Sequence, residues 1–187
     1  MLRLSLVCSG IGEAMKRGAF PAFDDAVLEP RSIAMAGDLR KTLQAADKVL
    51  VASDPRARQT AELLGLSGEE RDDLREQNYG QWAGKTLVEI ETNEAAGLAL
   101  WIADPDFTPP GGESLTAVAM RAQSLLAQLE KQSGHVIAVT HPAITRCAVL
   151  HVLAAPLSGF WQLDASPLCL TDLRHDGRRW ALRRHGA

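Results

Sequence analysis

Short apolar runs recur along the chain and are separated by segments in which apolar residues repeat with helical spacing. Three compact runs, at residues 2–7, 48–52 and 136–140, predict strands buried on both faces of a sheet. The helical pattern predicts longer helices at residues 31–46, 56–64, 114–132 and 143–153. Because strands and helices alternate, we expect an α/β fold, a three-layer α/β/α sandwich with a mostly parallel central sheet.

The pattern is less regular between these segments and near the end of the chain. Residues 86–91 and 94–102 have the character of two short helices, whereas residues 69–73 form an acidic stretch that we expect to be solvated. Residues 162–173 and 178–184 predict two strands, joined by a dipeptide, Asp-Gly, that is typical of hairpin turns. We interpret the arginines of this hairpin as its solvated outer face, because no element that reads nucleic acid accompanies them.

Composition narrows the class of protein without changing this picture. A chain of 187 residues with 46% apolar and 23% charged residues is large enough for one domain, which we place at residues 1–187. The net charge of -3 gives no general attraction to nucleic acid or to acidic membranes. No apolar run is long enough to span a bilayer, and the first residues lack the pattern of a signal peptide.

The cysteines indicate the compartment and argue against a metal site. Cys8, Cys147 and Cys169 are odd in number and widely spaced, so they form neither a Cys-x-x-Cys pair nor a zinc-binding pattern. This usage favours a reduced, cytoplasmic setting. We therefore expect a cytoplasmic protein with no metal and no cofactor.

The first strand ends in Cys8-Ser9-Gly10, whose small residues allow a tight turn and a close approach of the backbone to a ligand. Ligands of open α/β sheets bind beyond the carboxyl ends of the strands, so we expect the functional site here. Gly10 and Gly12 also begin a dinucleotide-binding pattern, but its third glycine would fall at Met15. We therefore set aside a nicotinamide cofactor.

Charged side chains follow the other strands. Arg56 and Arg58 lie in the first turn of a predicted helix, where free N–H groups and a guanidinium suit a phosphate. His141 stands where a strand becomes a helix, at the positive end of the helix dipole. Glu76 lies near Trp82, and a carboxyl group beside apolar rings suits a general acid. Taken singly, each of these residues is more often structural or solvated.

Four segments nevertheless occur together in an order typical of one family. They are Arg56-Ala57-Arg58-Gln59-Thr60-Ala61, Glu76-Gln77-Asn78-Tyr79-Gly80-Gln81-Trp82, Pro110-Gly111-Gly112-Glu113-Ser114, and the strand and helix around His141. With these segments the chain resembles the histidine phosphatase (phosphoglycerate mutase-like) superfamily from Leu2 to about Trp180. The resemblance implies the fold expected above and a pocket for a phosphate ester.

The resemblance also implies a role for individual residues. Arg56 is the expected phosphate-binding arginine, but the turn before it is one residue shorter than usual, which leaves Arg58 open. Glu76 is implied to deliver or remove a proton, and His141 to stabilise the transferring phosphoryl group. Glu113 is expected to line the site.

One departure from the family pattern decides the prediction of function. The family's first strand ends in Arg-His-Gly, whose histidine attacks phosphorus, whereas Cys8 and Ser9 stand at the first two of these positions here. No motif places a general base beside Ser9, and losing a covalent nucleophile costs about 10⁴- to 10⁶-fold in rate. We expect the strand ends carrying Ser9, Arg56 and His141 to converge. The residues expected at the site are Ser9, Glu76 and His141 at the catalytic positions, and Cys8, Gly10, Arg56, Arg58 and Glu113 for binding.

We therefore predict a pseudoenzyme, inactive or very weak, that retains a pocket for a small phosphorylated molecule, phosphate or sulfate. The alternative is an active phosphatase of a small phosphomonoester, such as a sugar, glycerate or nucleotide-loop phosphate, with an altered nucleophile. A Cys8 thiolate lacks the arginine that cysteine phosphatases carry six positions later, where Ala14 stands. Arg184-His185-Gly186 spells the missing tripeptide only at the end of the chain, which favours coincidence. A protein partner or a homodimer stays open.

Overall fold

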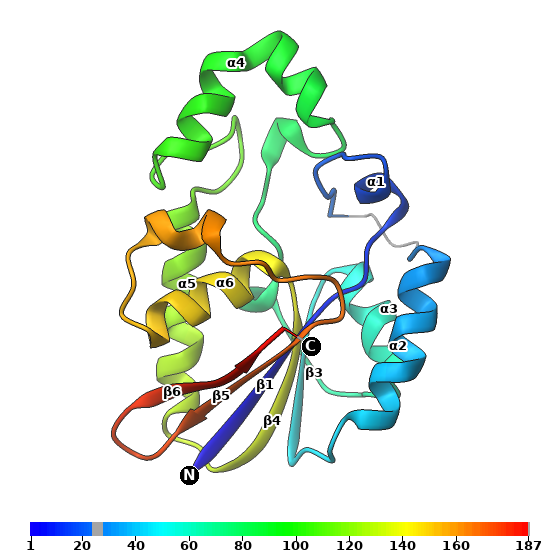
Figure 1. The fold of residues 1–187 in the computed structure, drawn as a ribbon, viewed down its shortest axis with the longest axis vertical. Helices are drawn as coiled ribbons and strands as arrows, with labels where there is room; N and C mark the ends of the chain where they lie inside the picture. The colour runs from blue at the N-terminus through cyan, green and yellow to red at the C-terminus, as the bar shows by residue number, and fades with distance from the viewer. Residues whose placement is uncertain (24–27, 187) are drawn as a thin grey trace.

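The structure, a computed structural model, describes residues 1–23 and 28–186, and a six-stranded sheet runs through its centre (Figure 1). The strands lie in the order β3-β2-β4-β1-β5-β6. Their bounds are β1 Leu2–Cys8, β2 Lys48–Ala52, β3 Glu69–Arg71, β4 Gly134–Thr140, β5 Leu170–His175 and β6 Trp180–His185. Strands β1 to β4 are parallel, and the hairpin of β5 and β6 joins β1 in antiparallel register. The carboxyl ends of β1 to β4 therefore meet at one edge of the sheet.

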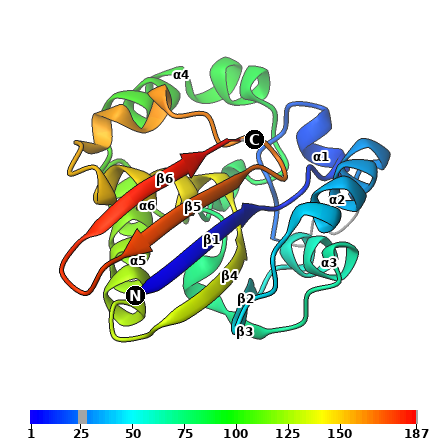
Figure 2. The ribbon, with the colours of Figure 1, turned by 60° about the horizontal axis from the view of Figure 1, so that its bottom comes forward.

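Helices cover both faces of this sheet, which confirms the three-layer prediction. On one face α2 (Pro30–Thr42) packs with α3 (Pro55–Leu64), and on the other α5 (Leu115–Leu129) packs with α6 (Pro142–Val152) (Figure 2). The remaining helices, α1 (Glu13–Lys16) and α4 (Leu87–Ala103), lie beyond the carboxyl ends of the parallel strands (Figure 1). Short 3₁₀ helices occupy Asp72–Leu74, Gly80–Trp82 and Leu157–Gln162.

The core forms around β1 and β4, because strands flank each of them on both sides and helices cover both faces. Leu4, Leu6 and Val7 of β1 are fully buried, as are Ala138 and Val139 of β4. Burial on both faces requires a continuous apolar run, which is the pattern that predicted these strands. Within the described residues, we find no helix with both the length and the apolar character needed to cross a membrane.

Three details differ from the sequence prediction. The stretch expected to be solvated contains β3, whose Glu69 and Glu70 are exposed; charged side chains are typical of a short strand at a sheet edge. The two helices expected from residue 86 to 102 meet in α4 at a kink, where Glu94 has φ -145° and ψ 41°. The strand expected from residue 162 begins at Leu170, after a 3₁₀ helix and a loop.

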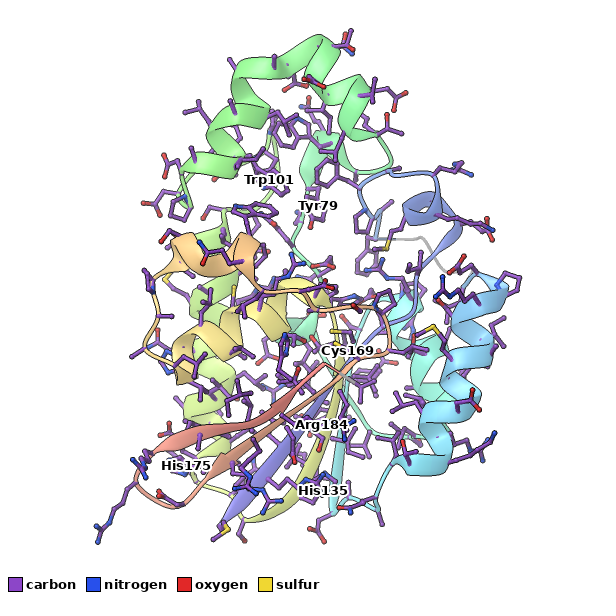
Figure 3. The ribbon with its side chains drawn as sticks, viewed as in Figure 1. Tyr79, Trp101, His135, Cys169, His175 and Arg184 are labelled. Atoms are coloured by element: carbon purple, nitrogen blue, oxygen red, sulfur yellow. The ribbon has the colours of Figure 1, made fainter. Side chains whose placement is uncertain are left out.

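An aromatic cluster fixes the segment that carries Glu76 above the sheet. Trp82 is fully buried, and its ring centroid lies 6.1 Å from that of Trp101 in α4. The ring centroid of Phe20 lies 4.7 Å from that of Tyr79 and 5.3 Å from that of Trp101, so the rings of three segments pack together. Figure 3 shows Tyr79 and Trp101 between α4 and the sheet. Such edge-to-face packing stabilises the loop that lies over the ends of the parallel strands.

Candidate functional site

The carboxyl ends of the parallel strands bring the predicted residues together. Ser9 follows β1 and His141 follows β4, and the Ser9 N–H donates to the Thr140 carbonyl at 2.7 Å, which holds these two strand ends side by side. Arg56 enters from the first turn of α3, the helix after β2. Glu76 comes from the loop after Asp72–Leu74. The expected convergence of Ser9, Arg56 and His141 is thus present.

His141 is the centre of this cluster. Its ring is completely buried, with Nδ1 2.9 Å from Ser9 Oγ and 2.9 Å from Arg56 Nη2. On the other side of the ring, Nε2 lies 2.5 Å from Asp54 Oδ2. A guanidinium can only donate and an ionised carboxylate can only accept. The hydrogen-bond pattern therefore assigns the ring proton to Nε2 and leaves the Nδ1 lone pair facing Ser9 and Arg56.

Asp54 holds His141 in this orientation and also begins α3. Its Oδ1 accepts from the Ala57 N–H at 3.1 Å, as an N-cap side chain does. Burial raises the pKa of Asp54, but the hydrogen bonds from His141 and the Ala57 N–H and the charge of Arg56 outweigh it, and the pKa lies below its ordinary value. Asp54 was not singled out from the sequence as a site residue. Its contact with His141 arises because β2 pairs with β4, so the turn after β2 lies beside the end of β4.

The structure distinguishes between the two candidate arginines. Arg56 is buried, with Nη2 3.6 Å from Glu76 Oε2, and its Nη1 donates to the Met15 sulfur. Arg58 is exposed and pairs with Glu70 at 3.5 Å on the outside of the fold. Of the two, only Arg56 lines the nearby cavity. The predicted residues Ser9 and His141 are buried next to Arg56 and are not among the lining residues.

This cavity has a volume of about 410 Å³, which suits a small molecule. It is lined by Pro21, Ala22, Phe23, Asp54, Arg56, Arg75, Glu76, Gln77, Asn78, Tyr79, Ala83, Glu113 and Arg121. Both predicted carboxylates, Glu76 and Glu113, are among these residues. Burial, together with the charge of Glu76, raises the pKa of Tyr79 well above its ordinary range, so its phenol stays neutral.

Two arginines of the wall were not singled out from the sequence, Arg75 and Arg121. Arg121 forms a two-point ion pair with Glu113, with both N···O distances at 2.8 Å. It also donates to the carbonyls of Asp73 and Arg75 at 2.9 and 3.2 Å, so it fixes the loop that leads to Glu76. Arg121 lies in the middle of α5, and no sequence pattern pairs it with a loop so far away in the chain.

Cys8 lies outside the cavity, in contrast to the prediction that it binds the ligand. Its sulfur is 3.3 Å from Thr145 Oγ1 and 3.5 Å from the Cys169 sulfur, in a buried cluster near the strand end at which Figure 3 labels Cys169. The hydrogen bond with Cys169 and burial raise the pKa of Cys8 well above its ordinary value, which favours the thiol. Adjacent residues of a strand point to opposite faces, so Cys8 turns away where Ser9 turns in.

Two further expectations are settled by hydrogen bonds. The Gly10 N–H, a candidate ligand donor, already donates to Thr60 Oγ1 at 3.1 Å. His185, in the tripeptide at the end of the chain, is bonded through Nδ1 to Thr171 Oγ1 at 2.8 Å and through Nε2 to the Asp164 carbonyl at 2.7 Å. It does not line the cavity.

No motif places a base beside Ser9 along the sequence, but in the fold Nδ1 of His141 is 2.9 Å from the Ser9 hydroxyl oxygen. The sequence separates these residues by more than a hundred positions, and only the parallel pairing of β1 with β4 brings them together. Among residues 1–23 and 28–186, no group of three or more His, Cys, Asp or Glu side chains is arranged to hold a metal ion.

Asp54→Asn tests the contact with His141 while keeping a good helix cap, because asparagine caps helices as well as aspartate does. A carboxylate whose pKa is lowered on folding stabilises the fold above its unfolded pKa and loses this effect as pH falls through the folded value. We expect the variant to lose about 1–3 kcal/mol of unfolding free energy at pH 7. Denaturant unfolding should show that the difference in unfolding free energy between the wild-type protein and the variant becomes smaller below about pH 4.

The matched control is Asp38→Asn, because Asp38 also has a lowered pKa, caused by the hydrogen bond from Lys41, but is exposed. Its substitution should leave stability unchanged within error at every pH. A loss for Asp54→Asn that is the same at pH 3 and pH 7 would contradict the assigned hydrogen bond from His141 to the ionised Asp54 carboxylate.

Comparison with known proteins places these observations in a family. The family model of the histidine phosphatase superfamily (branch 1) matches residues 4–187. Glucosyl-3-phosphoglycerate phosphatase of Mycobacterium tuberculosis is 38% identical over 56 residues, which are 30% of this chain and 25% of that protein. The match thus spans about a quarter of the length of this curated relative.

Solved structures share the fold over nearly the full length. The α-ribazole phosphatase of Shigella flexneri has a TM-score of 0.89 and 22% identity, and the alignment covers 99% of this chain and 96% of that one. A histidine-to-alanine variant of phosphoserine phosphatase from Entamoeba histolytica, in complex with phosphoserine, has a TM-score of 0.87 and 19% identity, covering 100% and 98%. Because the family model matches almost all of the sequence and the fold agrees, this chain belongs to the histidine phosphatase superfamily.

Proposed function

We propose that the chain binds a small phosphomonoester or a phosphate anion in the cavity beside His141 and does not process it through a phosphohistidine. The observation that carries this proposal is a buried guanidinium, Arg56, which opens onto the cavity between Glu76 and His141. Ser9 stands at the position from which the family's histidine attacks. The site thus combines the means to bind a phosphate with the loss of the usual nucleophile.

The hydrogen bonds of Arg56 leave room for an anion. Its Nη1 donates to a thioether sulfur, that of Met15, which is a weak acceptor. Its Nη2 is 2.9 Å from the neutral acceptor His141 Nδ1 and 3.6 Å from Glu76 Oε2, which is beyond a good hydrogen bond. Phosphate oxygens accept charge-assisted, two-point bonds from a guanidinium and are far stronger partners. An incoming phosphate group would therefore displace the Met15 contact.

Phosphohistidine chemistry needs an imidazole at the position of Ser9. An imidazole is available as a neutral nucleophile near pH 7, whereas a serine hydroxyl must lose its proton in order to attack. The serine side chain is also shorter, so its oxygen lies farther back from a phosphate bound in the cavity. The histidine-to-alanine variant of phosphoserine phosphatase was solved in complex with phosphoserine, so that relative binds its ligand without one of its histidines. These points support binding with very weak turnover.

Arg56→Ala and Arg58→Ala form a matched pair for testing the anion site. Both remove an arginine from the first turn of α3, but only Arg56 lines the cavity. We expect Arg56→Ala to weaken the affinity for inorganic phosphate and orthovanadate by about 10- to 100-fold, since a charge-assisted hydrogen bond contributes about 1.5–3 kcal/mol. Isothermal titration calorimetry measures this change. Equal effects of the two substitutions would place the anion elsewhere.

Ser9→His tests whether the missing imidazole limits turnover. We expect hydrolysis of p-nitrophenyl phosphate, measured by steady-state kinetics, to rise at least about 100-fold above that of the wild-type protein. The double variant Ser9→His with Arg56→Ala should lose the gain, because the phosphate is no longer held. A folded Ser9→His protein without any gain would mean that the pocket lacks more of the phosphatase machinery than the nucleophile.

A further inference from the structure

We propose that Ser9 is itself a nucleophile, with His141 as its general base and Asp54 as the residue that positions His141. The site would then transfer a phosphoryl group slowly to the Ser9 hydroxyl. This inference rests on the proposed function, since it requires the phosphate to bind beside Arg56. It goes beyond that function because it assigns a covalent reaction to a position at which the family's nucleophile is absent.

The three side chains form a continuous hydrogen-bonded relay. Ser9 Oγ is 2.9 Å from His141 Nδ1, and His141 Nε2 is 2.5 Å from Asp54 Oδ2. A hydroxyl, an imidazole and a carboxylate linked in this order are the arrangement by which serine hydrolases activate their nucleophile. Each group comes from the end of a different parallel strand or the turn after it, so the sheet fixes their relative positions.

The ring proton lies on the side that this role requires. The Asp54 carboxylate accepts from Nε2–H, so Nδ1 carries the lone pair that can take the Ser9 proton. Burial of the ring prevents water from competing for this lone pair. The base is therefore oriented before any ligand binds, which is the main contribution of the third residue in such relays.

Arg56 competes with Ser9 for the same lone pair in the structure. Its Nη2 lies 2.9 Å from Nδ1, the same distance as Ser9 Oγ. A phosphate ester in the cavity would draw Arg56 into charge-assisted bonds and leave Nδ1 to Ser9. Because both groups touch one nitrogen atom, a phosphoryl group held by Arg56 also lies within reach of Ser9. Ligand binding and activation of the nucleophile are thus linked.

The reaction balances with water as the second substrate. In the first step the Ser9 Oγ–P bond forms, the P–O bond to the alcohol breaks, the Ser9 proton passes to His141 Nδ1, and Glu76 gives a proton to the leaving oxygen on the opposite side of phosphorus. In the second step water attacks phosphorus from the side that the alcohol has left and gives its proton to Glu76, while the Oγ–P bond breaks and Ser9 regains its proton from His141. The Oε2 atom of Glu76 is 4.0 Å from His141 Nδ1, so both proton carriers belong to one site.

Ser9 is a better candidate than the cysteine next to it. The thiol of Cys8 is buried against Thr145 and Cys169, whereas the Ser9 hydroxyl is 2.9 Å from His141 Nδ1. Cys147 is also buried, and burial raises its pKa to about 12. Neither sulfur forms a hydrogen bond with His141.

A phosphonofluoridate probe tests the proposal directly, because an activated serine displaces fluoride and forms a stable phosphonyl ester. Intact mass spectrometry and peptide mapping of the full-length protein should show one adduct, on Ser9. Ser9→Ala should abolish the adduct, whereas Ser166→Ala, which removes an exposed hydroxyl, should label like the wild-type protein. Inorganic phosphate should slow the labelling by occupying the cavity.

Asp54→Asn distinguishes a positioning role from a structural one. We expect the labelling rate to fall by about 10²- to 10⁴-fold, because an asparagine no longer fixes the proton on Nε2. The midpoint of the rate-against-pH profile should also shift, which a purely structural contact would not cause. Melting temperatures measured on every variant verify that each one is folded.

The outcomes separate this inference from the proposed function. If Ser9 is not labelled although phosphate still binds in an Arg56-dependent manner, the nucleophile assignment is overturned and the binding function stands. If neither labelling nor phosphate binding is found, both are overturned. Labelling that persists in Ser9→Ala would assign the reactivity to another side chain and would also refute the inference.

Discussion

The contact between Asp54 and His141 is the interaction on which the site depends. It joins the turn after β2 to the end of β4, two points that the sheet pairing brings close but does not orient. Because the carboxylate also caps α3, it fixes the helix turn that presents Arg56. One side chain therefore sets the direction of both groups that would meet a phosphate. Without it, a buried imidazole would be free to turn its lone pair away from Ser9.

Ser9, which stands where the family has a histidine, lies within this hydrogen-bonded cluster. A serine alone is a poor replacement for an imidazole nucleophile, and the charge of the family's flanking arginine is absent at Cys8. Near Ser9, however, His141 already has its ring proton directed towards the Asp54 carboxylate. This leaves Nδ1 free to accept a proton, as a general base must. The proposed function and the further inference therefore rest on the same cluster: a serine replaces the imidazole nucleophile, and an oriented imidazole lies beside that serine.

The sequence predicted the parts of the site that continuous patterns encode. Buried strands are read from apolar runs, and residues that follow such strands share one edge of a parallel sheet, which is why Arg56 and His141 were expected together. Two features of the site could not be predicted from the sequence, for physical reasons. Asp54 stands at a helix N-cap, and only the pairing of β2 with β4 brings its carboxylate to His141 as well. Arg121 acts through the loop before Glu76, and periodicity along a helix says nothing about such long-range partners.

Other differences follow from the limits of the same patterns. β3 is a three-residue edge strand of charged residues, so it lacks the apolar run that identifies a buried strand. Cys8 was assigned to the pocket because of its place in a motif, although the alternation of side chains along a strand allows only one of two neighbours to face the site.

The proton position on the His141 ring tests this account most directly. Long-range ¹H–¹⁵N spectra of ¹⁵N-histidine-labelled protein at pH 8, assigned with His141→Gln, distinguish the two ring nitrogens. The account predicts a protonated Nε2 and an unprotonated Nδ1 in the free protein, with the same tautomer after saturation with inorganic phosphate. A proton on Nδ1, or a ring that averages between the two tautomers, would contradict it.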